Sequence, residues 1–302
     1  CAFLSLFVAC DDLEDKSTST TIDGNITETG TAEIYILSEG LFNLNNSSLA
    51  KYSFKSNKLV KNYFKDLNKR GLGDTANDIA LYGSKLYIVV NVSSTIEVID
   101  FQTGISIKQI PMFTDNGSSR QPRHIAFYEN KAYVCSFDGT VARIDTTSLQ
   151  IESFTKAGRN PENICVKNKK LYVSNSGGLD YSEGLGVWDM KSEQLVGTWN
   201  RLLNSRVSGL RIWDDRTVLV ATDGEGIFRM DIVNPDITSF IQTDFENDNS
   251  IRTNRIADVF VDDQKLIWVA DYPEGVSMID VESPDDYKWY RARSGDSHSL
   301  TN

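Results

Sequence analysis

One pattern recurs five times between residues 79 and 280 of this 302-residue chain. Each copy holds a short apolar strand, a turn, a second strand of the Leu-Tyr-Val type, a polar loop, and a strand that ends in aspartate. A partial copy over 33–64 precedes them. The closing aspartates, at intervals of 45, 44, 42 and 49 residues, are Asp100, Asp145, Asp189, Asp231 and Asp280. About 45 residues and four short strands per repeat is the period of a β-propeller blade. The chain is therefore predicted to be all-β, a β-propeller with six four-stranded repeats over residues 31–302.

The residues inside the repeats agree with strands rather than helices. They are β-branched and aromatic, and alternate apolar with polar, as in Ile96-Glu97-Val98. The prolines Pro122 and Pro161 fall between repeats, where no ladder donor is lost. Each closing aspartate is expected to accept backbone N–H bonds in the turn that follows it, which is a structural role. A segment at 297–302 resembles the opening of the last full copy, so a seven-bladed arrangement stays open.

The first residues are predicted to be a targeting segment rather than part of the fold. An apolar run ends in Ala9-Cys10 and is followed by the acidic cluster Asp11–Asp15. This arrangement resembles the end of a bacterial lipoprotein signal peptide, with the acidic export signal of Bacteroidetes surface lipoproteins. It implies a residual signal peptide over 1–9, lipidation at Cys10, and a disordered tether over 10–30. The alternative is that the apolar run is a buried first strand or helix.

The first half of the repeat region, 31–182, carries one family resemblance. The stretches are Tyr35–Gly40, Asn77–Ile79, Pro122–Ile125 and Leu171–Gly178. They resemble the YncE-like propeller lipoproteins of Bacteroidetes. That group includes surface lipoproteins that capture cobalamin and pass it to an outer-membrane transporter. The resemblance implies a lipid-anchored protein at the outer membrane or cell surface, with cobalamin as ligand and such a transporter as partner.

The second half, 183–302, carries a different resemblance. Gly184–Asp189, Thr222–Ile227 and Leu266–Asp271 resemble two-component regulator propeller repeats. Those repeats form periplasmic sensors that detect products of polysaccharide breakdown. The resemblance implies an oligosaccharide ligand, as the alternative to cobalamin. Asp271 stands where threonine is common in that family.

Composition excludes several functions. The chain has 31 Lys and Arg against 42 Asp and Glu, a formal net charge of −11, which argues against nucleic acid as a partner. Its two histidines and the absence of nucleophile or phosphate-loop motifs predict a protein that is not an enzyme and holds no metal and no cofactor. Cys135 and Cys165 fall within apolar strands and are expected to be buried thiols.

Propellers bind ligands where the loops between the second and third strands of each blade meet the loops that lead into the first strand. Polar residues at those places are the candidate site, and a ring of Asn, Arg and Tyr suits amide- or hydroxyl-bearing ligands. The loops between strands supply Glu39, Asn91, Asn175, Tyr181, Asp223, Asp271 and Tyr272. The loops leading into the first strands supply Asp78, Arg123, His124, Asn160, Asn163, Arg206, Asn254 and Arg255.

These observations predict a non-enzymatic, ligand-binding propeller lipoprotein. A sensor fragment for oligosaccharides, a propeller lyase or hydrolase, and a protein-interaction scaffold are the rival interpretations. The scarcity of histidine disfavours the enzyme, and His124 alone reads more readily as a hydrogen-bonded strand residue. Trp289 is open between a sugar-stacking platform and a packed side chain.

Overall fold

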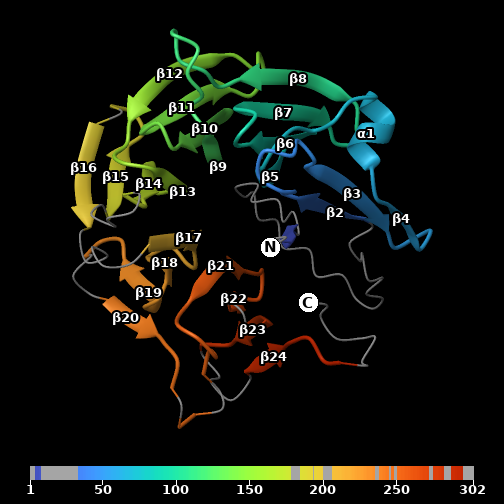
Figure 1. Ribbon diagram of the computed structural model, residues 1–302. Helices are drawn as coiled ribbons and strands as arrows, with labels where there is room; N and C mark the ends of the chain where they lie inside the picture. The colour runs from blue at the N-terminus through green and yellow to red at the C-terminus, as the bar shows by residue number, and fades with distance from the viewer. Residues whose placement is uncertain are drawn as a thin grey trace, which may run out of the picture. The chain divides into compact units, whose positions relative to one another are not determined.

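The computed structural model describes residues 4–7, 33–177, 184–192, 194–199, 206–234, 238–244, 246–247, 250–271, 275–281 and 287–294. These residues form six four-stranded antiparallel sheets, each with its strands in chain order (Figure 1). The sheets are the blades of a β-propeller, so the predicted all-β class and the predicted six repeats are confirmed. Within the described part of the chain, no helix is both long and apolar enough to cross a membrane.

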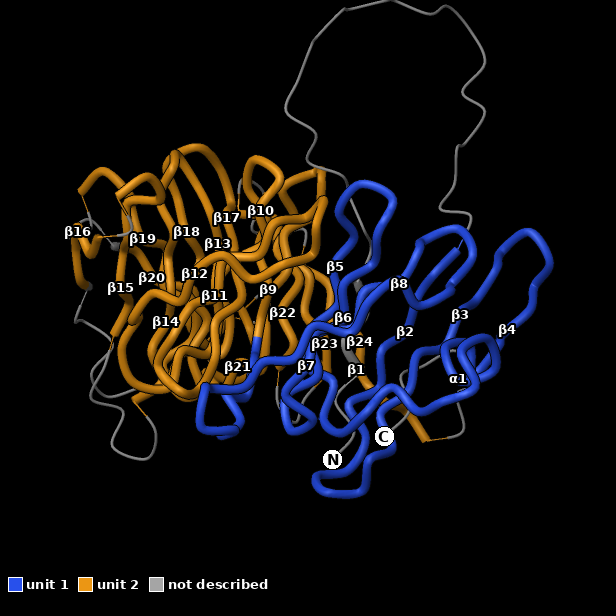
Figure 2. The backbone as a smooth tube through the Cα atoms, turned by 90° about the horizontal axis from the view of Figure 1, so that it is seen from above, with its two compact units in different colours: residues 1–123 blue, residues 124–302 orange. Residues whose placement is uncertain are grey.

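The chain separates into two compact units, residues 1–123 and 124–302 (Figure 2). The first unit holds two complete sheets and one short helix. The strands of its first sheet are β1 (Leu4–Phe7), β2 (Glu33–Ser38), β3 (Ser48–Ser53) and β4 (Lys58–Val60), followed by helix α1 (Tyr63–Asn68). The strands of its second sheet are β5 (Ala76–Tyr82), β6 (Lys85–Val90), β7 (Thr95–Asp100) and β8 (Ser106–Pro111).

The second unit holds the other four sheets, apart from the first two residues of β9. The third sheet comprises β9 (Pro122–Tyr128), β10 (Lys131–Ser136), β11 (Thr140–Asp145) and β12 (Ile151–Lys156). The fourth comprises β13 (Pro161–Lys167), β14 (Lys170–Asn175), β15 (Leu185–Asp189) and β16 (Gln194–Trp199). The fifth comprises β17 (Arg206–Ile212), β18 (Thr217–Asp223), β19 (Gly226–Asp231) and β20 (Thr238–Ile241). The sixth comprises β21 (Ile256–Val261), β22 (Ile267–Asp271), β23 (Gly275–Ile279) and β24 (Lys288–Tyr290).

The core lies between neighbouring sheets, which is why the strands differ in pattern across each sheet. The second strands are covered on both faces and read as continuous apolar runs, as in Leu86–Val90 of β6, where every residue is buried. The fourth strand β12 alternates half-buried with exposed residues, because its outer face meets solvent. One core cluster joins the fourth and fifth sheets through Tyr172, Leu210 and Phe228.

The closing aspartates perform the predicted structural role at Asp100, Asp145, Asp189 and Asp231, while most of the turn after Asp280 lies outside the described residues. Asp189 Oδ1 accepts the Ser192 N–H at 2.8 Å, and Asp231 Oδ1 accepts the Asn234 N–H at 2.9 Å. Asp100 and Asp145 make equivalent bonds to the third residue after each. The backbone donors lower the pKa of the Asp189 and Asp231 carboxyls, so these turns keep ionised caps at neutral pH.

A second repeated device is a β-bulge near the start of the first strand of a sheet. In β5, β13, β17 and β21 the register with the next strand shifts by one residue, which leaves one extra residue in each first strand. In three of these strands, an Asp or Asn follows the extra residue and accepts the N–H of its own successor. The acceptors are Asp78, Asn163 and Asp258, with N···Oδ1 distances of 2.9, 3.0 and 2.8 Å. The side chain thus satisfies a backbone donor at the bulge.

The partial first repeat differs from the prediction at its end. The apolar pattern predicts a strand over Leu59–Phe64, whereas the strand β4 ends at Val60 and helix α1 begins at Tyr63. The prediction is wrong there because Phe64 is buried from a helical turn, and the Asn68 side chain closes that turn by donating to the Phe64 carbonyl at 3.1 Å.

The apolar run at the start of the chain has a place in the first sheet. Residues Leu4–Phe7 form β1, antiparallel to β2, with Phe7 opposite Tyr35. The predicted cleavage at Ala9–Cys10, the lipidation at Cys10 and most of the tether lie outside the described residues and stay predictions. The predicted change of lineage near residue 182 also lies outside them.

Candidate ligand-binding site on the first strands of the second unit

The second unit brings polar side chains together along the first strands of its four sheets. Strand β17 packs against β13 on one side and β21 on the other, and a hydrogen bond links β9 to β13. We call the six polar residues on these strands the polar row. Its members are His124, Glu162, Asn163, Arg206, Arg211 and Asp258.

One half of the polar row is centred on Glu162, the extra residue in the bulge of β13. Its backbone carbonyl lies 2.5 Å from Nδ1 of His124. Its carboxylate lies 3.5 Å from the Arg206 guanidinium, a loose ion pair. The Glu162 side chain is 4 % exposed and that of Arg206 is 47 % exposed, so the pair joins a buried carboxylate to a half-exposed guanidinium.

The other half is held by Arg211, which links the two neighbouring first strands. Its Nη1 donates to Asn163 Oδ1 at 3.4 Å, and its Nη2 donates to Asp258 Oδ2 at 3.0 Å. Gly209 makes room for this arrangement, because a Cβ there would lie 2.6 Å from Asp258 Oδ1. The Arg211 guanidinium therefore connects three sheets, and the polar row has members on the first strands of four sheets, β9, β13, β17 and β21.

The polar row balances its charges. Two guanidinium groups face two carboxylates, so the row carries no net charge when His124 is neutral. Two polar atoms here have unmet hydrogen-bonding capacity. Nδ2 of Asn163, a member of the row, and the hydroxyl of Ser208, on the same strand as Arg206 and Arg211, are buried without a partner. Buried polar atoms are normally paired, so these two mark a place that is built for a further polar group. An electroneutral site of donors and acceptors suits a neutral ligand rich in amide or hydroxyl groups.

The cysteines lie near this site but do not offer a nucleophile. Cys135 and Cys165 are both free and buried, as the sequence predicts. Burial raises the pKa of the Cys165 thiol to about 12, although the nearby charge of Arg211 opposes this rise. The thiol therefore stays protonated at neutral pH.

Five residues predicted for loops lie inside first strands instead. The difference arises because each of these first strands begins three or four residues earlier than the apolar pattern indicates. These residues are Asp78 in β5, Arg123 and His124 in β9, Asn163 in β13 and Arg206 in β17. His124, Asn163 and Arg206 join the polar row, whereas Asp78 belongs to the first unit.

Other predicted residues make local contacts rather than one ring. Arg255 Nε donates to Asp223 at 3.0 Å, and Asn254 Oδ1 accepts the Thr243 N–H at 2.8 Å. The Asn160 carbonyl accepts the Ser176 hydroxyl at 2.9 Å. Such contacts hold the chain locally, which is a structural role.

The remaining described candidates are also held by neighbours. Asn91 donates to the Pro122 carbonyl at 3.1 Å, and the Glu39 carbonyl accepts the Ser47 hydroxyl at 2.5 Å. Asp271 is buried and accepts a bond from Ser277. Asn175 lines a cavity, described below. Tyr181 and Tyr272 lie outside the described residues.

Trp289 has cationic neighbours rather than an open face. The guanidinium carbons of Arg252 and Arg291 lie 4.8 and 4.4 Å from its ring centroid. The packed alternative therefore fits Trp289 better than a sugar-stacking platform. Among the residues that the structure describes, no group of three or more His, Cys, Asp and Glu is placed to hold a metal ion.

Sequence reasoning missed Glu162, Arg211 and Asp258. Their signal is the repeated start of the first strands, which reads Pro-Glu-Asn-Ile at 161–164 and Ile-Ala-Asp-Val at 256–259. Aligning these starts, rather than the closing aspartates, places Glu162 at the bulge and Asp258 level with Asn163.

Six four-stranded antiparallel blades, four of them with polar-row residues on their first strands, form a β-propeller, a fold consistent with a binding or scaffolding role. A family model described as "Domain of unknown function (DUF5074)" matches residues 32–254, and the chain belongs to this family. Among solved structures, it is similar to the computationally designed Ika8 protein. That likeness has a TM-score of 0.57 and 13% identity, covers 88% of this chain and 73% of the other, and concerns the fold alone. The search of curated proteins found no significant match.

Proposed function

We propose that this protein is a non-enzymatic binding propeller whose polar row captures a neutral, amide- or hydroxyl-rich small molecule. The observation that carries the proposal is a set of polar contacts between four consecutive first strands. His124 contacts the Glu162 carbonyl, Arg206 pairs with the Glu162 carboxylate, and Arg211 contacts Asn163 and Asp258. A structural network alone would be expected to satisfy its buried atoms, whereas Asn163 Nδ2 and Ser208 Oγ keep free capacity. Cobalamin, which carries several neutral amides, is the ligand that the YncE-like resemblance favours.

The exposed guanidinium of Arg206 supplies the test. Arg206→Ala removes the exposed guanidinium of the polar row and leaves the buried residues of the row in place. We therefore expect it to weaken cobalamin binding by about tenfold. Isothermal titration calorimetry of the full chain with cobalamin measures this change.

The matched control is Arg216→Ala. Arg216 is also an exposed arginine in an ion pair, with Asp231, and it lies beyond the other end of β17. We expect it to leave the affinity unchanged. Equal affinity in both variants, or no heat with cobalamin from a folded sample, contradicts the proposal.

The second part of the proposal is that Cys10 anchors the protein to a membrane by a lipid. When the protein is expressed in bacterial cells with a lipoprotein leader, we expect it in the membrane fraction. Cys10→Ser is expected to move more than about nine-tenths of it to the soluble fraction, because the loss of the diacyl anchor removes nearly all membrane affinity. Immunoblots of the two fractions measure the change.

Cys1→Ser is the control, because it changes a cysteine of the same segment and leaves the predicted cleavage site intact. An inhibitor of the lipoprotein signal peptidase is expected to leave a larger precursor. If Cys10→Ser stays with membranes, or the inhibitor leaves the mobility unchanged, the anchor is ruled out.

A further inference from the structure

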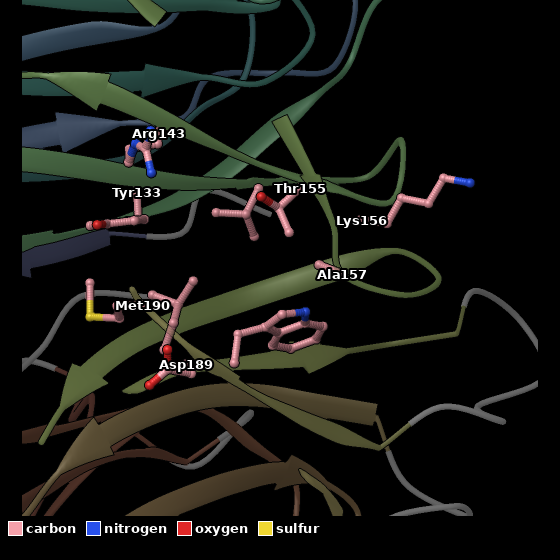
Figure 3. A pocket seen from close by; sticks show the side chains of 10 residues that line it. Tyr133, Arg143, Thr155, Lys156, Ala157, Asp189 and Met190 are labelled. Atoms are coloured by element: carbon pink, nitrogen blue, oxygen red, sulfur yellow. The ribbon is translucent and has the colours of Figure 1, made fainter. Parts of the chain in front are cut away.

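Two adjoining cavities lie between the third and fourth sheets, and both are bordered by Lys156, Ala157 and Trp188. The smaller has a volume of about 20 Å³, room for one water molecule. In Figure 3 the side chains of Tyr133 and Arg143 lie on one side of it and Asp189 and Met190 on the other. It is too small for a ligand and is a packing defect of the interface.

The larger cavity has a volume of about 380 Å³, within the range of small-molecule sites. None of its lining residues belongs to the polar row. Its walls come from the end of β12 and the loop after it, and from strands β14, β15 and β16. The lining residues are Lys156, Ala157, Gly158, Asn175, Gly184, Leu185, Gly186, Trp188, Leu195 and Thr198.

Two glycines make this cavity possible. Gly158 has a φ of +120°, and a Cβ there would lie 2.6 Å from the Asn175 amide nitrogen. At Gly186, a Cβ would lie 2.1 Å from the Trp188 indole, so the absent side chain lets the ring fold back over β15. The glycines thus place an amide and an indole at the cavity wall.

The polar chemistry of the cavity is specific. Asn175 is 5 % exposed, and its Oδ1 is buried without a hydrogen-bond partner. An orphaned acceptor needs a donor, which a hydroxyl group provides and a carboxylate does not. The Thr198 hydroxyl can donate or accept. Lys156 is the one charged residue among the side chains that line the larger cavity.

We propose that the larger cavity binds a neutral hydroxylated ring, of the size of one or two sugar units. The apolar C–H face of such a ring packs against Trp188 and the leucines, and its hydroxyl groups donate to Asn175 Oδ1 and exchange hydrogen bonds with Thr198. This site is separate from the polar row and does not depend on the function proposed for it.

The test fills the cavity from its exposed side. Leu195 lines the cavity and is 53 % exposed, so Leu195→Trp adds bulk there without disturbing the core. Val196 follows Leu195 in β16, is 54 % exposed and does not line the cavity, so Val196→Trp is the matched control. The probes are glucose, galactose, N-acetylglucosamine and maltose, with glucuronate as the anionic comparison. Binding to the full chain is measured by saturation-transfer NMR and calorimetry.

We expect at least one neutral probe to bind more tightly than glucuronate. Leu195→Trp is expected to weaken that binding by at least tenfold and Val196→Trp to leave it within twofold. Asn175→Leu, which keeps the volume and removes the acceptor, is expected to weaken it by about tenfold. Neither Leu195 nor Asn175 belongs to the polar row, so a loss in these two variants assigns the binding to the cavity.

The proposal is overturned if the folded protein binds none of the neutral probes, or if Leu195→Trp and Val196→Trp bind equally. Equal binding of glucuronate and glucose would also overturn it, because the cavity would then not favour a neutral ring over an anionic one. Circular dichroism of each variant establishes that it is folded before binding is measured.

Discussion

Replacing Arg70 with methionine is expected to destabilise the first unit by about 3 kcal/mol. Glu97 on β7 is fully buried, and both of its carboxylate oxygens accept from Arg70 Nη2 at 2.8 Å. Arg70→Met keeps an apolar stem against Phe64, over which the guanidinium now lies, but leaves a buried carboxylate with only the Ser106 hydroxyl. This loss of stability is at the lower end of the range for a broken buried ion pair, because the Arg70 side chain is 39 % exposed.

All five tryptophans of the chain fall in residues 124–302, so urea unfolding of the first unit is best followed by circular dichroism. The double variant Arg70→Met/Glu97→Gln is expected to recover more than half of the loss, since no uncompensated charge remains. The control Arg216→Met breaks a largely exposed pair and is expected to cost less than about 1 kcal/mol. Equal stability of Arg70→Met and wild type would show that Glu97 is solvated or needs no cation.

Replacing Gly186 with alanine is expected to cost about 2–3 kcal/mol and to shift tryptophan emission to longer wavelength. The new Cβ would lie 2.1 and 2.2 Å from two ring atoms of Trp188, far inside contact distance. Trp188 is 7 % exposed, so its indole must leave a buried position or push β15 away from its neighbours. Urea unfolding followed by tryptophan fluorescence measures both effects.

The control is Gly197→Ala on the adjacent strand. Gly197 pairs with Val187, and a Cβ there meets only the Val187 Cβ at 4.0 Å, an ordinary contact. Alanine restricts the unfolded chain, so we expect this variant to match or exceed wild-type stability by up to about 1 kcal/mol. If both alanines behave alike, the close approach of Trp188 to Gly186 is not what the fold requires.

The fold could be predicted from the sequence because each repeat is marked by its strand patterns and its turn residues. The closing aspartates identify the turns, and the bonds from Asp189 and Asp231 show why aspartate recurs there. The helix at Tyr63–Asn68 was not accessible, because a six-residue helix carries too few turns to separate 3.6 from 2.0 periodicity.

The site was accessible only in part. His124, Asn163 and Arg206 follow from polar residues near the first strands, whereas their partners Glu162 and Arg211 do not. A bulge moves every later side chain to the other face of its strand, and no residue type marks a bulge in a single sequence. The pairing of Arg211 with Asp258, 47 residues on, depends on two neighbouring sheets and has no local signal.

In the repeated bulges, two neighbouring residues have different roles. The Asp or Asn after the bulge is committed to the backbone, as at Asp78, Asn163 and Asp258. The extra residue before it has no opposite partner, and it differs from sheet to sheet: Asn77, Glu162, Ser208 and Ala257. In these four blades the protein can therefore change what it recognises at one residue each, while the hydrogen bonds that hold the blade together stay the same. Those positions are where divergence within the family, or a library made in the laboratory, would alter ligand choice at least risk to folding.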